Sequence, residues 1–170
     1  MIDVSSFDLF NYLEQQEMEK VLSHVHTRSF SKKTQIVTEG DTSHSLYFLL
    51  DGKVKVYLND DNGKEIIINM HKPGDFFGEL GLVKNIPRTA SIITVSACKI
   101  GVMQEADFKH CLASYPAFSI ALIENLSTRL IQATETMRQL GLMDVYQRIA
   151  VTFLNLSEPR GRVRVIPLRN

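Results

Sequence analysis

Cysteine is scarce in this chain of 170 residues, which contains only Cys98 and Cys111. Two thiols are too few for a four-thiolate zinc or iron–sulfur site, and they do not form a CxxC pair. A disulfide scaffold is excluded on the same ground. We therefore expect both cysteines to be thiols of a hydrophobic core, with no metal.

The sequence also lacks a long apolar run and a secretory signal. The longest apolar stretches, residues 145–156 and 120–126, contain polar positions and fall short of the roughly 18 residues that a membrane helix needs. The first residues show no basic and apolar signal pattern. These absences predict a cytoplasmic protein without a membrane partner.

Neither sign of charge is in excess, because 19 Lys and Arg residues balance 19 Asp and Glu residues and the pI is near 7.0. This balance argues against a chain whose whole surface binds nucleic acid. The sequence also lacks a P-loop, a GxGxxG motif, a nucleophile elbow and a Ser-His-Asp order. We therefore predict that the chain is not an enzyme.

The histidines offer a weak indication of a metal site. His24 and His26 form a His-x-His pair, but at a helix end the two rings would point to different faces. No suitably placed glutamate follows, so we disfavour the metal. His44, His71 and His110 are scattered along the chain, and we expect them at the surface.

The hydrophobic pattern changes its period along the chain, which has 44% hydrophobic residues. Apolar positions recur every three or four residues from residue 6 to 24, which predicts one or two short helices. Two-residue alternation then predicts strands, separated by glycine-containing turns, at 35–37, 45–50, 53–58, 65–70, 90–95 and 99–103. The fold class is therefore mainly β with α, an antiparallel β-roll of the jelly-roll (double-stranded β-helix) type with flanking helices.

Helical character returns at residues 104–113, and Pro116 opens a long helix at a position where its missing N–H is harmless. Apolar residues follow at steps of three and four, while the positions around them are polar. A narrow stripe of this kind favours a parallel dimeric coiled coil over simple packing onto the chain's own core. The predicted dimer seam consists of Ile123, Leu126, Leu130, Ala133, Met137 and Leu140.

We expect a domain boundary after this helix, between a domain of residues 1–140 and a segment of residues 141–170. A hinge is predicted at 141–144, and Asp144 starts a capping box for a helix through Leu156. A turn at 157–161 and a strand at 162–166 complete the chain. Because this strand has no evident partner, we expect the chain to stop inside a second domain, as in a truncated or proteolytic fragment. The arginines from Arg160 to Arg169 fit a solvated strand edge better than a nucleic-acid patch.

The densest group of special residues runs from Pro73 to Leu82 and continues at Pro87-Arg88-Thr89-Ala90. Gly78 allows a close backbone approach, and a helical turn starting there would direct N–H groups at an anion. Arg88 adds a forked positive charge that suits phosphate. Glu79 would be repelled by that phosphate, but it can accept hydrogen bonds from a sugar hydroxyl. The alternative is a surface ion pair between Glu79 and Arg88, which would contribute about 0–1 kcal/mol.

These two segments resemble the phosphate-binding cassette of cyclic nucleotide-binding domains, and residues 22–166 resemble the Crp/Fnr (catabolite activator-like) transcription regulators. Residues 142–150 are similar to the hinge and first helix that lead into that family's winged helix-turn-helix. The resemblance implies that Gly78, Glu79 and Leu80 meet the ribose and phosphate, and that Arg88 and Thr89 hold the cyclic phosphate. It places Val56 and Asn69 near the sugar and base. Arg129 and Thr134 would approach the purine.

The sequence departs from the cAMP-responsive members at Ala133, where a threonine hydroxyl is expected to meet the adenine amino group. The loss of one such hydrogen bond weakens discrimination by about 0.5–1.5 kcal/mol. We therefore expect a cyclic nucleotide, cAMP before cGMP, as an allosteric effector, with no cofactor.

The resemblance implies a homodimer that passes the effect of the ligand through the long helix to a DNA-binding domain. DNA is the expected partner of the full-length protein, with weak or no binding by this fragment, because the family's recognition helix would follow Asn170. A different class remains open: a dimerising scaffold, or a sensor of another small effector, whose nucleotide pocket is empty or altered.

Overall fold

A computed structural model describes residues 7–42, 44–60 and 63–142, together with residues 153, 157–160 and 163–165. Its Cα packing divides the chain into two compact units, Met1–Asn125 and Leu126–Asn170. The predicted boundary between residues 140 and 141 stays a prediction. Each unit is described by itself below.

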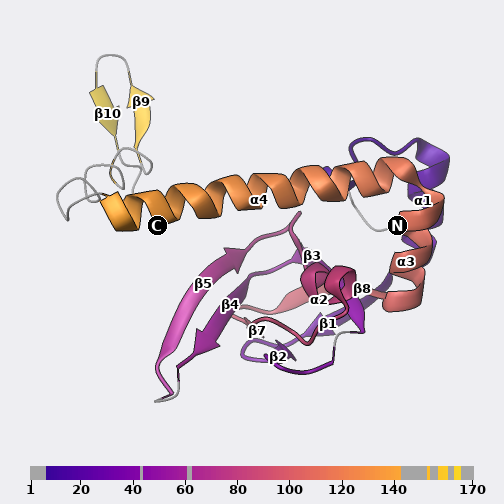
Figure 1. Ribbon diagram of the computed structural model, residues 1–170, viewed down its shortest axis with the longest axis horizontal. Helices are drawn as coiled ribbons and strands as arrows, with labels where there is room; N and C mark the ends of the chain where they lie inside the picture. Colours follow the sequence, from indigo (N-terminus) through magenta and orange to yellow (C-terminus); the bar gives the residue numbers. More distant parts are fainter. Residues whose placement is uncertain are drawn as a thin grey trace. The chain divides into compact units, whose positions relative to one another are not determined.

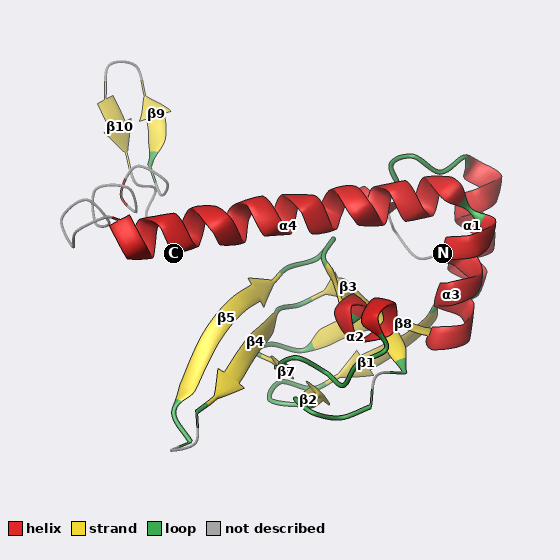
Figure 2. Ribbon diagram, in the orientation of Figure 1, coloured by secondary structure: helices red, strands yellow, loops and turns green. Residues whose placement is uncertain are grey.

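The described part of the first unit contains two four-stranded antiparallel sheets, and Figures 1 and 2 show their strands. One sheet has the order β1-β8-β3-β6, built from His26–Phe30, Cys98–Gln104, Ser45–Asp51 and Phe76–Phe77. The other has the order β2-β7-β4-β5, built from Gln35–Val37, Ser91–Thr94, Val54–Asn59 and Glu65–His71. The predicted antiparallel roll is confirmed, and the six predicted strands correspond to β2, β3, β4, β5, β7 and β8.

Strand β3 explains why one segment of the sequence is apolar without interruption. Leu49 belongs to the core cluster that also contains residues of the second sheet, such as Val54 and Ile92. The ring of Phe48 instead packs against Phe7 and Phe10, each with a centroid distance of 5.7 Å. A strand that is buried on both faces needs apolar residues at successive positions, so strict alternation is lost.

Strands β1 and β6 were not predicted. Most of β1 is exposed, so its residues carry no apolar alternation, yet all five pair with β8, from His26 opposite Val102 to Phe30 opposite Cys98. Strand β6 has two residues and pairs with β3 at Tyr47 and Phe48. Both strands exist because a neighbouring strand supplies their hydrogen bonds, which a local pattern cannot reveal.

The helices of the first unit agree with the sequence pattern. The predicted N-terminal helices are a 3₁₀ turn, η1 (Asp8–Phe10), and α1 (Gln15–Ser23), whose start has a capping box between Glu14 and Glu17. Helix α2 (Glu79–Lys84) follows β6, and α3 (Glu105–Ser114) is the helix predicted at residues 104–113. Helix α4 (Pro116–Leu142) begins at the predicted proline and extends into the second unit.

Both cysteines are free and buried, as predicted for core thiols. Burial, together with the charge of the nearby Asp107 carboxylate, raises the pKa of Cys111 to about 11. A thiol with so high a pKa is protonated at neutral pH and therefore a poor nucleophile.

The described part of the second unit contains the rest of α4 and a β-hairpin of β9 (Glu158–Arg160) and β10 (Val163–Val165). The expectation that the strand near residue 164 has no partner is wrong, because β10 pairs antiparallel with β9, with Val165 opposite Glu158. The segment expected to be only a turn thus contributes a strand of its own. Helix α4 continues through Gly141 to Leu142. The rest of the predicted hinge, and the predicted capping box at Asp144, lie outside the described residues.

The predicted dimer seam lies along α4. Ile123, Leu130 and Met137 are 61, 67 and 62% exposed. Ala133 is also exposed, Leu126 is half-buried, and the side chain of Leu140 is outside the described residues. The apolar stripe is therefore accessible within a single chain, and dimerisation stays a prediction.

Candidate ligand-binding site

The candidate site begins at Gly78, which connects β6 to α2. Gly78 has a φ of 90° and stands at the N-cap of α2. A Cβ atom at this position would lie 2.5 Å from Nη1 of Arg88 and 3.1 Å from the Ser45 carbonyl oxygen. Glycine is therefore required both by the left-handed backbone and by the close approach of the arginine.

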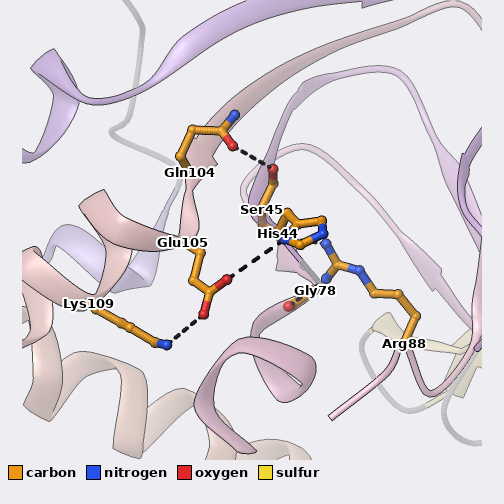
Figure 3. A network of polar contacts seen from close by, with 7 residues as sticks. All are labelled: His44, Ser45, Gly78, Arg88, Gln104, Glu105 and Lys109. Atoms are coloured by element: carbon orange, nitrogen blue, oxygen red, sulfur yellow. Dashed lines mark hydrogen bonds and ion pairs between the residues drawn. The ribbon is translucent and has the colours of Figure 1, made fainter. Parts of the chain in front are cut away.

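Arg88 places its guanidinium between two segments of the roll, as Figure 3 shows. Its Nη1 donates a hydrogen bond to the Gly78 carbonyl oxygen at 2.8 Å, and its Nη2 donates to the Ser45 carbonyl oxygen at 2.7 Å. The main chain of Arg88 is held as well, because its N–H donates to Asp41 and its carbonyl accepts from Gly40. Both ends of the residue are thereby fixed to the roll.

The environment of Arg88 is that of a buried charge. The residue is 7% exposed. Burial lowers the pKa of Arg88 from its ordinary value, and Tyr47, Glu79 and Asp41 raise it in part. An arginine remains charged at neutral pH even so. Five N–H donors, of which two bind these carbonyls, leave the guanidinium with capacity for an anionic ligand.

Glu79, the first residue of α2, is also buried, with 3% of its surface exposed. It acts on the pKa of Arg88 through its charge, so both charges belong to one site. The alternative of a surface ion pair is wrong, since neither group lies at the surface. A buried carboxylate beside a buried guanidinium can accept hydrogen bonds from a polar ligand while the cation compensates its charge.

Three stacked rings continue from Arg88 into the roll. The guanidinium carbon of Arg88 lies 5.5 Å from the centroid of the Tyr47 ring. The ring of Tyr47 stacks on Phe77 at 5.1 Å, and Phe77 stacks on His71 at 5.6 Å, both with interplanar angles of 14°. His71 is 6% exposed, so its predicted surface position is wrong: β5 turns this side chain toward the core.

Val56 and Asn69, which the resemblance places near the sugar and base, lie opposite each other on β4 and β5. Side chains two residues apart share one face of a strand, so Asn69 lies on the same face of β5 as His71. Val56 packs against the core cluster that contains Phe77. The structure thus brings these two residues together as a cross-strand pair, with Val56 half-buried and Asn69 exposed.

The remaining predicted site residues are exposed or lie in the second unit. Leu80 is 47% exposed on α2, and Thr89 is exposed directly after Arg88. Arg129, which is half-buried, and Thr134, which is exposed, lie on α4 in the second unit. The Thr134 hydroxyl donates a hydrogen bond to the Leu130 carbonyl oxygen at 2.9 Å.

A polar network leads from Ser45 to the start of α3 (Figure 3). The Ser45 hydroxyl contacts Gln104 at 3.4 Å, and Glu105 lies 3.9 Å from His44 and 2.5 Å from Lys109. An open cleft of about 500 Å³ lies beside these groups, lined by His44, Gln104, Glu105, Ala106 and Lys109. The network connects the residue that holds Arg88 to a helix of the first unit.

Sequence reasoning missed Ser45, Tyr47 and His71 as parts of this site, and it included Phe77 only as a member of the segment from Pro73 to Leu82. Ser45 contributes a carbonyl oxygen, which every residue type has, so no sequence signal could have identified it. Tyr47 belongs to a strand that reads as ordinary core, and His71 was expected at the surface. The pairing of β3 with β6 sets Tyr47 opposite Phe77, and the burial of His71 on β5 brings its ring against Phe77.

Two findings concern metals and membranes. Within the described residues, no group of three or more His, Cys, Asp or Glu side chains could hold a metal ion. His24, at the end of α1, instead has its Nδ1 atom 2.8 Å from Asp107 of α3. In the same part of the chain, no helix has the length and apolar character needed to cross a membrane.

Comparison with known proteins first identifies the type of domain that this chain contains. The family described as cyclic nucleotide-binding domain matches residues 27–115, a range that includes both sheets apart from His26 and the whole segment from Gly78 to Thr89. The first unit therefore contains a cyclic nucleotide-binding domain at residues 27–115.

Relatives that match most of the chain then define the family. The cAMP-activated global transcriptional regulator CRP of Salmonella typhimurium is 32% identical over 142 residues, which cover 83% of this chain and 68% of the relative. The corresponding regulator Vfr of Pseudomonas aeruginosa is 31% identical over 147 residues, covering 84% and 69%. The catabolite activator protein of Thermus thermophilus matches in structure with a TM-score of 0.73 and 26% identity, covering 88% of this chain and 70% of that one. The chain belongs to the Crp/Fnr family of transcription regulators.

Proposed function

We propose that this chain is the effector-sensing part of a Crp/Fnr regulator and that it binds a cyclic nucleotide, with cAMP as the first candidate. The observation that carries this proposal is the buried pair of Arg88 and Glu79 within the segment that the domain family matches. A cyclic nucleotide has one phosphate charge and one ribose hydroxyl. A fork of N–H donors beside a carboxylate matches both groups.

In this proposal each predicted residue has one role. Arg88 and Thr89 hold the cyclic phosphate, while Gly78, Glu79 and Leu80 contact the ribose and phosphate. Val56 and Asn69, which are opposite each other on β4 and β5, contact the sugar and base. Arg129 and Thr134 of α4 approach the purine.

The hydrogen bond of Thr134 supports adenine over guanine. Its hydroxyl hydrogen is directed to Leu130, so its oxygen lone pairs can accept a further hydrogen bond. Adenine carries an amino donor at the position where guanine carries a carbonyl acceptor. Since Ala133 has no hydroxyl, Thr134 supplies the discrimination in this proposal without a second hydroxyl beside it.

The ligand would act through a homodimer. In this proposal the exposed stripe of α4 joins two chains as a parallel coiled coil, and the ligand binds one arrangement of the dimer better than another. The full-length regulator would pass this change to a DNA-binding domain, in keeping with the names of its relatives.

A second candidate is a sensor of a different effector. The structure of CLP from Xanthomonas campestris, a c-di-GMP responsive global regulator, matches with a TM-score of 0.72 and 25% identity, covering 86% of this chain and 73% of that one. Together with Ala133, this likeness favours testing c-di-GMP beside cAMP and cGMP.

Calorimetric titration of the purified chain with these three nucleotides tests the proposal. Arg88→Ala should weaken cAMP binding by about 100-fold or more, because two charge-assisted hydrogen bonds contribute about 1.5–3 kcal/mol each. Arg88→Lys keeps the charge without the fork and should retain part of the affinity. Arg28→Ala removes an exposed arginine of β1 and serves as the matched control. Unchanged cAMP affinity in a folded Arg88→Ala variant would contradict the phosphate assignment, and binding of c-di-GMP alone would favour the second candidate.

A further inference from the structure

The buried guanidinium of Arg88 rests against an aromatic ring as well as two carbonyl groups. Its carbon lies 5.5 Å from the Tyr47 centroid, within the range of a cation–π contact. The two carbonyl groups, of Gly78 and Ser45, accept hydrogen bonds from separate guanidinium nitrogens. The carbonyls direct the N–H groups, while the ring limits movement of the guanidinium out of its own plane.

Tyr47 is itself held in place. Its ring stacks on Phe77, which stacks on His71, and the planes of each pair differ by 14°. The far end of the row is fixed as well, because His71 Nδ1 lies 3.3 Å from Asp75 Oδ2, and the same oxygen accepts the Lys72 N–H at 2.9 Å. A ring held by a stacked neighbour provides a more rigid support than a ring facing solvent.

The same row also determines where Gly78 lies. Tyr47 and Phe77 are opposite residues of β3 and β6, and Gly78 directly follows Phe77. Stacking of Tyr47 on Phe77 therefore positions the ring beneath Arg88 and the carbonyl group that Arg88 contacts. The stacking of Tyr47 on Phe77 thus acts on both the ring and the Gly78 carbonyl group, which together orient the guanidinium.

We propose that Tyr47 is a positioning residue for ligand binding: its ring, supported by Phe77 and His71, holds the Arg88 guanidinium in the orientation that receives the phosphate. This inference rests on the proposed function for its ligand. The position of Arg88 itself can be tested without any nucleotide.

The first measurement is the NMR signal of the Arg88 Nε–H group, identified by its disappearance in Arg88→Lys. The rate at which this proton exchanges with water reports how firmly the guanidinium is held, and it should be slow in the wild type and in Tyr47→Phe, which keeps the ring. In Tyr47→Leu the exchange should approach the rate of an exposed arginine. Unchanged exchange of the Arg88 signal in Tyr47→Leu would overturn the inference. If this variant does not fold, Tyr47→Met replaces it in both measurements.

The second measurement is a double-mutant cycle of cAMP binding. Tyr47→Leu should raise the Kd by about 3- to 30-fold, the range expected for loss of a partly desolvated cation–π contact. In the Arg88→Ala background the same substitution should change the Kd by less than about twofold, because its effect passes through Arg88. Tyr47→Phe should restore affinity to within about threefold of the wild type.

Tyr57 supplies a matched control, since its ring also lies beneath a cation, with Lys55 Nζ 5.0 Å from the centroid. Tyr57→Leu should leave the cAMP Kd and the exchange of the Arg88 signal unchanged. An equal loss of affinity from Tyr47→Leu with and without Arg88 would overturn the inference, because Tyr47 would then act on the ligand directly. If the wild-type chain binds no cyclic nucleotide, the proposed function fails, and the NMR comparison alone decides whether Tyr47 positions Arg88.

Discussion

Gly78 is the single residue at which backbone conformation and site geometry depend most directly on each other. Replacing it with alanine forces a side chain into the left-handed region at φ 90° and brings its Cβ to 2.5 Å from Arg88 Nη1. Gly78→Ala should therefore lower the free energy of unfolding by about 1–3 kcal/mol and weaken nucleotide binding. Urea unfolding and calorimetry measure the two effects.

Gly63 distinguishes backbone strain from crowding. It has a φ of 77°, yet a Cβ there would meet nothing within 4 Å. Gly63→Ala should thus lose only the backbone preference, about 1 kcal/mol, and keep nucleotide affinity. If Gly63→Ala and Gly78→Ala behave alike in both measurements, crowding against Arg88 is not what requires glycine at position 78.

At the scale of secondary-structure elements, α4 presents apolar side chains to solvent along its predicted seam. Leu130 is 67% exposed, and burial of a leucine contributes about 1.5–3 kcal/mol. Leu130→Lys should therefore weaken self-association by at least about tenfold, measured by sedimentation equilibrium.

Ile131, the next residue, lies outside the seam and is 70% exposed, which makes it a matched control on the same helix. Ile131→Lys adds the same charge at a neighbouring position and should leave self-association unchanged. Equal effects of the two substitutions would show that the heptad stripe is not the contact between chains.

For the whole molecule, ligand binding and dimerisation should be coupled in both directions. If the dimer binds cAMP more tightly than the monomeric Leu130→Lys variant by some factor, saturating cAMP must strengthen dimerisation by the square of that factor, because a dimer contains two sites. Calorimetry measures the cAMP affinities of the dimer and of the monomeric variant. Sedimentation with and without cAMP measures how much the ligand strengthens dimerisation. Equal cAMP affinities for monomer and dimer would contradict transmission through α4.

The order of elements could be predicted from the sequence because it depends on local patterns. Two-residue alternation identified β2, β3, β4, β5, β7 and β8, and Pro116 marked the start of α4. The segment from Gly78 to Thr89 was likewise recognisable, since it needs particular residue types at a particular spacing. Family membership followed from these residues, and the comparisons confirm it.

The sequence alone did not predict the features that depend on long-range strand pairing or on burial in the folded chain. Strand β1 lies in the sheet through its pairing with β8, and β10 has a partner in β9. His71 is buried because β5 directs it at Phe77, although a histidine in a polar sequence context suggests the surface. These features depend on contacts between distant segments, which composition and periodicity do not encode.

The sequence by itself determined the residue types of the candidate site, because a glycine, a carboxylate and a guanidinium have properties that no other side chains reproduce. Only the tertiary structure decided that Arg88 is held by the carbonyl groups of Ser45 and Gly78 and by the ring of Tyr47. The reason is physical. Carbonyl groups occur at every position and rings occur throughout any core, so their role depends on where folding places them.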